Sequence, residues 1–499
     1  MNPPTLDEPP PRQPWEEPPP DGWGSHLGNV GLEVALFVFS VGVGLLGARV
    51  LGAAERMGRG HLEGGRLALV VALWASVCVL GALLAVYVWR RLGGLFLVGA
   101  MLTDMGRAAR LRGRPPVFLD EKPPAGSEAL SLVHLSDLHV VEQPRVRLVE
   151  RRAPGGNARL EAILDRPELD DTDLLLVTGD VTDRGTAIAW RSFLEILDER
   201  GLAERTLLVP GNHDLALLEL LDGADRRARR RAALRADRFS IVQLANLLKF
   251  AEAFTATYGG RHGFVLSEDG SDIVPWEDAF RAVERRVRPM LQALPERPAP
   301  TARLRTWLRD RAAIAEYARP LDEAHEALQR LFPVAVPVAG RDAVVFVLNS
   351  VTARSRHPAT NALGRVGRPQ YRRLDRLARF FGQSLRLVSL HHHVVRRPEE
   401  AGLNLRDRLI AKLTVLGDPR PLLRFCRREG VRAVLHGHRH LSYQLRLPDG
   451  TVLLAAPSST LGDELAHDPR AHLERYVFAP RVEAVTCGIH REVAHPDVS

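Results

Sequence analysis

The sequence predicts an α/β domain that follows an N-terminal membrane region. Short apolar runs alternate with helical patterns from about residue 129 to residue 456, which is typical of buried strands separated by helices. Two long apolar stretches before residue 90 predict the membrane region. At 499 residues the chain also exceeds what one hydrophobic core usually covers.

The first 128 residues divide by composition. Residues 1–26 are rich in proline and acidic side chains, so we expect a disordered acidic tail. Residues 27–102 are expected to form a membrane region with two transmembrane helices at about 32–51 and 67–89, because each stretch is long and apolar enough to span a bilayer. The proline-containing residues 103–128 are expected to be a linker.

Arginines around the two apolar stretches indicate how the chain is oriented in the membrane. Two spans place both termini on one side, and the positive-inside rule assigns the more basic flank to the cytoplasm. We therefore expect a multi-pass membrane protein that contacts lipids through both helices and whose following domain is cytoplasmic. Arg56, Arg59 and Arg66 lie between the stretches, whereas Arg90, Arg91, Arg107, Arg110, Arg112 and Arg114 follow the second.

Composition narrows the classes of function. The net charge of +8 comes from 68 Lys and Arg against 60 Asp and Glu, which suits contact with phosphates or anionic lipids. Aromatic residues make up only 6% of the chain and are scattered, so no nucleic-acid stacking platform is predicted. The three cysteines form no CxxC pair, which argues against a disulfide framework and a thiolate zinc site.

Seven apolar runs define the α/β domain, which is expected to span residues 129–499. Their continuous apolar character predicts strands buried on both faces. Between about residues 215 and 337 the sequence becomes rich in Ala, Leu and Arg with helical spacing, so a helical insertion is expected there. The seven runs are Ala129–Leu135, Asp173–Thr178, Thr206–Val209, Ala343–Leu348, Leu385–Leu390, Val431–Leu435 and Thr451–Ala456.

Polar clusters follow five of these runs, at the point where each predicted strand ends. Ligands of open α/β sheets sit at the carboxyl ends of strands, so these clusters can converge on one site. Nine of the 18 histidines fall in or beside the clusters, which a solvated or structural role does not explain. The clusters are SDLH at 136–139, GDVTDR at 179–184, GNHD at 211–214, HHH at 391–393 and GHRH at 437–440.

The spacing within the clusters predicts a metal centre. In Asp137-x-His139 and His438-x-His440, alternate side chains can point to the same face. Asp180, which follows a glycine, is the best candidate for a carboxylate between two ions. Two ions roughly 3.5–4 Å apart can activate a shared water or hydroxide as nucleophile. Oxygen and imidazole donors suit Fe, Mn, Zn or Co.

The ordered set DLH, GDVTD, GNHD, HHH and GHRH resembles the calcineurin-like metallophosphoesterase superfamily. The stretch NALGRVGRPQYRRLDRLAR before HHH is most similar to its cyclic-nucleotide phosphodiesterase branch. The resemblance covers the chain from about residue 129 onward, without the insertion. It implies a four-layer sandwich of two mixed β-sheets flanked by helices.

The resemblance also implies a role for each site residue. Asp137, His139 and His440 would bind one metal ion, Asn212, His392 and His438 a second, and Asp180 would bridge them. His213 would contact the phosphate and assist the leaving group, with Asp214 orienting it. The family usually shows His-His-Pro where this chain has three histidines and Val394, so the choice of His392 rests on aligning Val394 with that proline; His391 is the alternative.

The sequence thus predicts a metal-dependent phosphodiesterase or phosphatase that acts on a small-molecule or lipid phosphate ester. Two transmembrane helices make a membrane-associated lipid-pyrophosphate hydrolase an alternative. A non-catalytic metal-binding scaffold is the other, although such a scaffold has no need of a complete ligand set.

Overall fold

The computed structural model describes the part of the chain that carries the site. The chain divides into two units, Met1–Asp104 and Met105–Ser499, and only the second contains described residues. The predicted acidic tail and both predicted transmembrane helices lie outside the described residues. Within the described residues, no helix combines the length and apolar composition that a membrane crossing requires. The described residues are 114–123, 128–141, 156–215, 236–293, 323–351, 364–383, 385–395, 414–462, 470–480 and 487–495.

One of the two sheets has five strands in the order β13-β12-β1-β2-β3. The neighbours β1, β2 and β3 run parallel, whereas β12 pairs antiparallel with both β1 and β13. The sheet is therefore mixed, and its parallel strands end at the same edge. The strands are β1 (Leu130–Leu135), β2 (Leu174–Val177), β3 (Thr206–Leu208), β12 (Leu473–Phe478) and β13 (Ile489–Ala494).

The other sheet has eight strands in the order β10-β11-β9-β8-β7-β6-β4-β5. Its centre, from β7 through β8 and β9 to β11, is parallel, and antiparallel strands lie on both sides of that centre. Its strands are β4 (Phe264–Leu266), β5 (Ile273–Pro275), β6 (Val334–Pro337), β7 (Ala343–Val347), β8 (Leu385–Ser389), β9 (Ala433–His436), β10 (Tyr443–Arg446) and β11 (Val452–Ala455).

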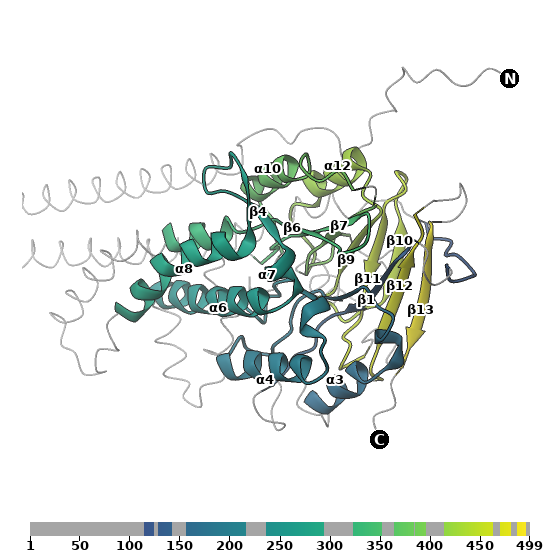
Figure 1. The fold of residues 1–499 in the computed structure, drawn as a ribbon, viewed down its shortest axis with the longest axis horizontal. Helices are drawn as coiled ribbons and strands as arrows, with labels where there is room; N and C mark the ends of the chain where they lie inside the picture. Colours follow the sequence, from purple (N-terminus) through teal and green to yellow (C-terminus); the bar gives the residue numbers. More distant parts are fainter. Residues whose placement is uncertain are drawn as a thin grey trace, which may run out of the picture. The chain divides into compact units, whose positions relative to one another are not determined.

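Helices flank the two sheets (Figure 1). In β7, Val345 and Val347 belong to one hydrophobic cluster and Val344 and Phe346 to another, so the sheet is buried on both faces. The second cluster includes side chains of α10 and α12, and the first includes side chains of α3 and α4. Each fully buried aliphatic or aromatic side chain of this kind contributes about 1.5–3 kcal/mol. These helices are α3 (Gly156–Leu164), α4 (Ala187–Asp198), α10 (Arg368–Leu377) and α12 (Pro419–Glu429).

The predicted α/β architecture with two mixed sheets and flanking helices is confirmed. All seven predicted strand segments contain an observed strand: β1, β2, β3, β7, β8, β9 and β11. The sequence did not predict β10, β12 and β13, which carry charged residues. Glu474 in β12 is fully buried and accepts a hydrogen bond from Arg491 in β13 at 2.7 Å, so pairing makes these charges compatible with the sheet.

The predicted helical insertion at 215–337 is only partly helical. Its described helices are α6 (Ala236–Ala256), α7 (Tyr258–His262) and α8 (Trp276–Ala293). The short hairpin β4–β5 and strand β6 lie in the same stretch and extend the eight-stranded sheet, with Phe264 of β4 opposite Ala335 of β6. Strands of three or four residues leave too little periodicity to be recognised from the sequence.

Candidate metal centre

The five polar clusters lie at the carboxyl ends of strands from both sheets. SDLH follows β1, GDVTDR follows β2 and GNHD follows β3 in the five-stranded sheet. HHH follows β8 and GHRH follows β9 in the other. Within the eight-stranded sheet, the Gly437 amide donates to the His391 carbonyl. Between the two sheets, the His438 amide donates to Asp137 Oδ2 at 2.9 Å. Residues about 300 positions apart therefore share one site.

Backbone strain marks the same residues. Among the described residues, five non-glycine residues have a positive φ, the left-handed region that L-residues rarely adopt. Such strain persists only where the surrounding structure imposes it, and it concentrates at functional sites. All five are predicted metal ligands: Asp137, His139, Asp180, His438 and His440.

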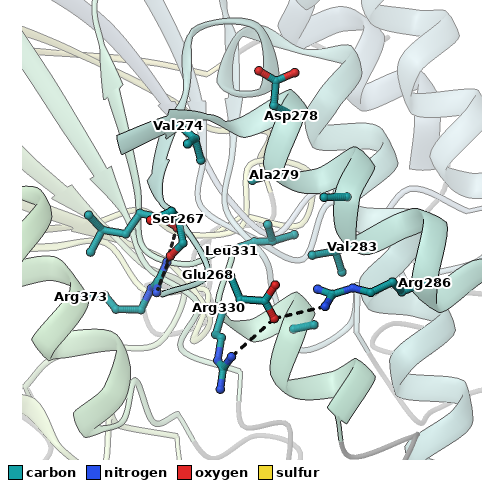
Figure 2. Close-up of a pocket in the computed structure, with 13 residues that line it drawn as sticks. Ser267, Glu268, Val274, Asp278, Ala279, Val283, Arg286, Arg330, Leu331 and Arg373 are labelled. Atoms are coloured by element: carbon teal, nitrogen blue, oxygen red, sulfur yellow. Dashed lines mark hydrogen bonds and ion pairs between the residues drawn. The ribbon is translucent and has the colours of Figure 1, made fainter. Parts of the chain in front are cut away.

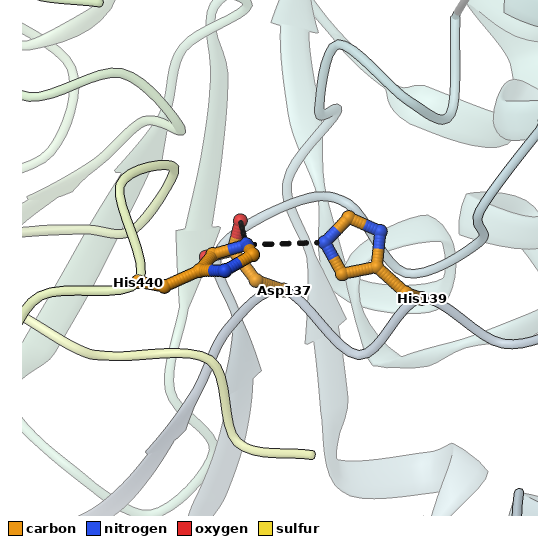
Figure 3. Close-up of side chains that lie close together, drawn as sticks. All are labelled: Asp137, His139 and His440. Carbon is orange, nitrogen blue, oxygen red and sulfur yellow. Dashed lines mark hydrogen bonds and ion pairs between the residues drawn. The ribbon is translucent and has the colours of Figure 1, made fainter. Parts of the chain in front are cut away.

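Asp137, His139 and His440 form the first group of ligand atoms (Figure 3). One ligand atom from each lies within 4.8 Å of the other two, and all three residues are buried. The two imidazoles point at each other, with His139 Nε2 3.2 Å from His440 Nε2, and His440 Nε2 lies 3.5 Å from Asp137 Oδ1. Atoms bound to one ion at about 2.0–2.2 Å are separated by similar distances, so this group fits one metal ion.

A second group forms around His391. Its Nε2 lies 3.2 Å from Asp180 Oδ2, 3.0 Å from Asn212 Oδ1 and 3.1 Å from His438 Nδ1. Asp180, His391 and His438 again present ligand atoms within 4.8 Å of one another. An imidazole, a carboxylate, an amide oxygen and a second imidazole thus converge as they would around a second ion.

Asp180 connects the two groups. Besides its contact with His391, it has an oxygen within 4.8 Å of ring nitrogens of His139 and His213. Its backbone φ is 49°, and its Oδ1 accepts a hydrogen bond from the His213 amide at 2.7 Å. A carboxylate that reaches both groups is what a bridging ligand requires.

The geometry distinguishes the two histidines that the sequence left open. His391 Nδ1 lies 2.8 Å from the Thr178 carbonyl, and this contact turns its Nε2 toward Asp180. His392 instead contacts Ser350 Oγ through its Nδ1 at 2.9 Å and belongs to neither group. Adjacent residues after a strand point in different directions, so only one of them can fill the position. The structure favours the alternative, His391.

Three glycines allow this close approach. A Cβ on Gly211 would lie 1.9 Å from the Asp180 nitrogen, and one on Gly437 would lie 1.7 Å from Ser136 Oγ. Gly179, with φ at 93°, faces His391, whose Nδ1 would be 2.5 Å from an added Cβ. The glycine before each ligand is therefore a steric requirement of the site.

The hydrogen bonds of Asp214 support a role other than the predicted orientation of His213. Asp214 accepts hydrogen bonds from the amides of Gly211, Val181 and Thr182 and from the Thr182 hydroxyl, and His213 Nδ1 is engaged with the Asp183 carbonyl. Burial, with Asp180 nearby, raises the pKa of Asp214 to about 6. Asp214 thus anchors the GNHD segment to the GDVT segment.

Sequence reasoning missed the contribution of Asp183. Its carbonyl oxygen lies 3.0 Å from His213 Nδ1, and its carboxylate Oδ1 lies 3.5 Å from His139 Nδ1. It therefore holds the outer nitrogen of a candidate ligand, which fixes ring orientation in metal sites. The sequence feature that could have indicated this role is the position of Asp183 within the GDVTDR cluster, two residues before the turn at Gly185.

The protonation states of the second group favour binding of a cation. Burial lowers the pKa of His391, but Asp180 beside it outweighs that effect and raises the pKa to about 9. Burial likewise favours a neutral Asp180, yet His391 and His213 hold its pKa well below the ordinary value. Burial lowers the pKa of His438 to about 3, so that this ring is neutral and able to bind metal. An ion can replace the proton that His391 carries.

The cavity shown in Figure 2 is separate from this centre. It measures about 250 Å³, and none of the candidate ligands lines it. Its wall includes apolar side chains of α8, and Arg286 and Arg330 both point to Glu268, at 3.2 and 3.7 Å. The metal centre is therefore identified by convergent donor atoms rather than by the size of a cavity.

Comparisons with known proteins agree with these observations. Residues 130–325 match the family model of the calcineurin-like phosphoesterases. A comparison with curated proteins found no match.

Solved phosphatase structures cover about three quarters of the chain at low similarity. A dimetal phosphatase from Danio rerio is 11% identical, with a TM-score of 0.31, and covers 74% of this chain and 99% of its own. A purple acid phosphatase from yellow lupin is 10% identical, with a TM-score of 0.35, and covers 75% of this chain and 53% of its own. A 5′-nucleotidase from Candida albicans is 12% identical, with a TM-score of 0.31, and covers 78% and 53%. The chain spans about half the length of the last two proteins.

The match to the calcineurin-like phosphoesterases covers residues 130–325, the part of the chain that contributes β1, β2 and β3 and the clusters after them.

Proposed function

We propose that this chain is a hydrolase, which cleaves phosphoric esters with two metal ions held between its two sheets. The observation that carries the proposal is the convergence of oxygen and imidazole donors from five strand ends into two groups that share Asp180. These donors suit Fe, Mn, Zn or Co. The proposed ligands are Asp137, His139 and His440 for one ion, Asn212, His391 and His438 for the other, and Asp180 for both.

Metal ions bound there would supply the positive charge that activates water at neutral pH and offsets the charge developing on the phosphoryl oxygens. His213 lies beside the first group, with its ring centroid 4.6 Å from that of His139, and 13% of its side chain is exposed. Its Nδ1 is engaged with the Asp183 carbonyl, so Nε2 is the atom that can pass a proton to the leaving ester oxygen.

The proposal is tested with the full-length chain purified in detergent. Hydrolysis of a chromogenic bis-aryl phosphate is measured after loading with each of Fe, Mn, Zn and Co. We expect Asp180→Ala and Asn212→Ala to lower kcat/KM by at least roughly 10³-fold, about 4 kcal/mol of transition-state stabilisation, while the fold persists. The exposed Asp120→Ala is the matched control and keeps full activity. Wild-type metal binding without hydrolysis of any phosphate ester would indicate a binding scaffold instead.

For the substrate, we propose a phosphodiester or phosphomonoester of small or lipid-linked type. The sequence before HHH resembles the cyclic-nucleotide phosphodiesterases, which favours a cyclic nucleotide. The two apolar N-terminal stretches favour a lipid pyrophosphate. Comparing kcat/KM for cyclic nucleotides with that for lipid pyrophosphates in detergent separates the two, because the preferred class has the larger value.

We also propose that residues 32–51 and 67–89 anchor the chain in a membrane, with the hydrolase domain in the cytoplasm. The support is their length, their apolar composition and the arginines that follow the second stretch. A chain that partitions with membranes after carbonate washing, and whose domain is protected from protease added outside intact cells, agrees with this proposal. Release by carbonate contradicts the anchor.

A further inference from the structure

The turn that carries Asp137 and His139 is held from two sides. Both residues are strained, with φ at 52° and 49°. The amides of Asp137 and His139 donate to the carbonyls of Gly179 and Asp180, at 3.1 and 3.0 Å. These contacts tie the turn to the backbone of the segment that carries Asp180, and the turn's own carbonyl groups are hydrogen-bonded by another segment.

The segment after β11 binds those carbonyl groups. Ser458 Oγ donates to the Asp137 carbonyl at 2.7 Å, and Thr460 Oγ1 donates to the Leu138 carbonyl at 2.9 Å. Between them, the Ser459 amide donates to the Ser136 carbonyl at 2.8 Å, and Ser459 Oγ accepts from the Ser136 amide at 3.1 Å. Three consecutive residues therefore bind three consecutive residues of the turn.

The segment is itself firmly held. Ser458, Ser459 and Thr460 are each at most 1% exposed. Ser458 Oγ also accepts from the Leu461 amide at 3.0 Å, and the Thr460 carbonyl accepts from Arg159 Nη1 at 2.8 Å. The two hydroxyls, which are themselves buried, donate to the Asp137 and Leu138 carbonyls. Losing either hydroxyl leaves a buried acceptor next to a strained ligand.

We propose that Ser458 and Thr460 are positioning residues, which keep Asp137 and His139 in the orientation that binds the first metal ion. This inference rests on the proposed function, since it concerns the same metal centre. Outer partners of this kind orient ligands without touching the ion, and removing them weakens metal binding by about 10–100-fold.

The experiment measures Mn²⁺ affinity by calorimetry on the full-length, metal-free chain in detergent. Ser458→Ala and Thr460→Val remove one hydroxyl each with little change in volume. Thr206→Val is the matched control: Thr206 is also fully buried and donates to a carbonyl, that of Leu202 at 2.8 Å, but it lies at the amino end of β3. Thr460→Ser and Ser458→Thr keep the hydroxyl and test for rescue. Thermal unfolding of each metal-free variant reports the general loss of stability.

We expect Ser458→Ala and Thr460→Val to weaken binding at the first site by roughly 10–100-fold, while the control and the rescue variants bind as the wild type does. Equal Mn²⁺ affinity in wild type, Thr460→Val and Ser458→Ala overturns the inference and leaves the proposed function standing. A wild type that binds no Mn²⁺ or other metal overturns the proposed function as well. If a hydroxyl deletion prevents folding, loss of affinity in the folded Thr460→Ser variant contradicts the assignment.

Discussion

Replacing His391 or His392 by alanine tests which of these two histidines is the metal ligand. Both side chains are fully buried, and the residues are adjacent, so the two substitutions remove the same atoms from similar surroundings. Their contacts differ: His391 Nε2 lies within 3.2 Å of Asp180, Asn212 and His438. His392 contacts Ser350 through Nδ1, and its ring centroid lies 4.4 Å from that of His438.

The expected magnitudes follow from those contacts. Loss of an outer partner costs about 10–100-fold in metal affinity, and loss of a direct ligand costs more. We therefore expect His391→Ala to weaken the second site by at least roughly 100-fold, about 3 kcal/mol of binding free energy. His392→Ala should cost no more than about tenfold, because only the orientation of a neighbouring ring is disturbed.

The assay is Mn²⁺ titration of the metal-free, full-length chain, with metal content measured after dialysis. Thermal unfolding of both metal-free variants serves as control, because both changes open a cavity of the same size and should lower stability similarly. The reasoning is refuted if His392→Ala loses the second ion while His391→Ala retains it.

Three further predictions concern the surroundings of the ligands. Gly211→Ala should destabilise the fold by about 1–3 kcal/mol or more and abolish metal binding, because the added Cβ would lie 1.9 Å from the Asp180 nitrogen. Denaturant titration measures the loss of stability. The control is Gly382→Ala, where an added Cβ has nothing within 4 Å, and its free energy of unfolding should be unchanged. Asp214→Ala should lower the free energy of unfolding by about 2–5 kcal/mol, because four buried donors lose their acceptor; an unchanged urea midpoint would contradict the anchoring role. Mn²⁺ affinity should rise with pH toward about 9, because the raised pKa keeps His391 protonated below that value and the ion needs the neutral ring. Calorimetry in buffers of different ionisation enthalpy should detect about one released proton at pH 7. A pH-independent affinity would contradict the role of His391 as a ligand.

The central strands and the convergence of their ends could be predicted because both depend on strong local signals. Buried parallel strands such as β2 (LLLV) and β8 (LRLVS) are nearly continuous apolar runs. In Asp137-x-His139 and His438-x-His440, alternate residues at a strand end can point to the same face, so the spacing indicated that both members of each pair face one site. The sequence shows the glycines before Asp180, Asn212 and His438, but only the structure shows that a larger residue at these positions would collide with the site.

What could not be predicted depends on contacts between distant segments. The choice between His391 and His392 is made by the Thr178 carbonyl, which lies more than 200 residues earlier in the chain. Ser458 and Thr460 bind the Asp137 turn across about 320 residues, and they sit in no recognisable motif. The charged strand β12 pairs with both β1 and β13, two strands that lie far from each other in the sequence.

The most direct test of the two-metal centre is anomalous diffraction from crystals of the chain grown with Mn²⁺. We predict two anomalous peaks roughly 3.5–4 Å apart on either side of Asp180, one within bonding distance of Asp137, His139 and His440 and the other of Asn212, His391 and His438. A metal-loaded crystal with no anomalous density among these residues would contradict the account.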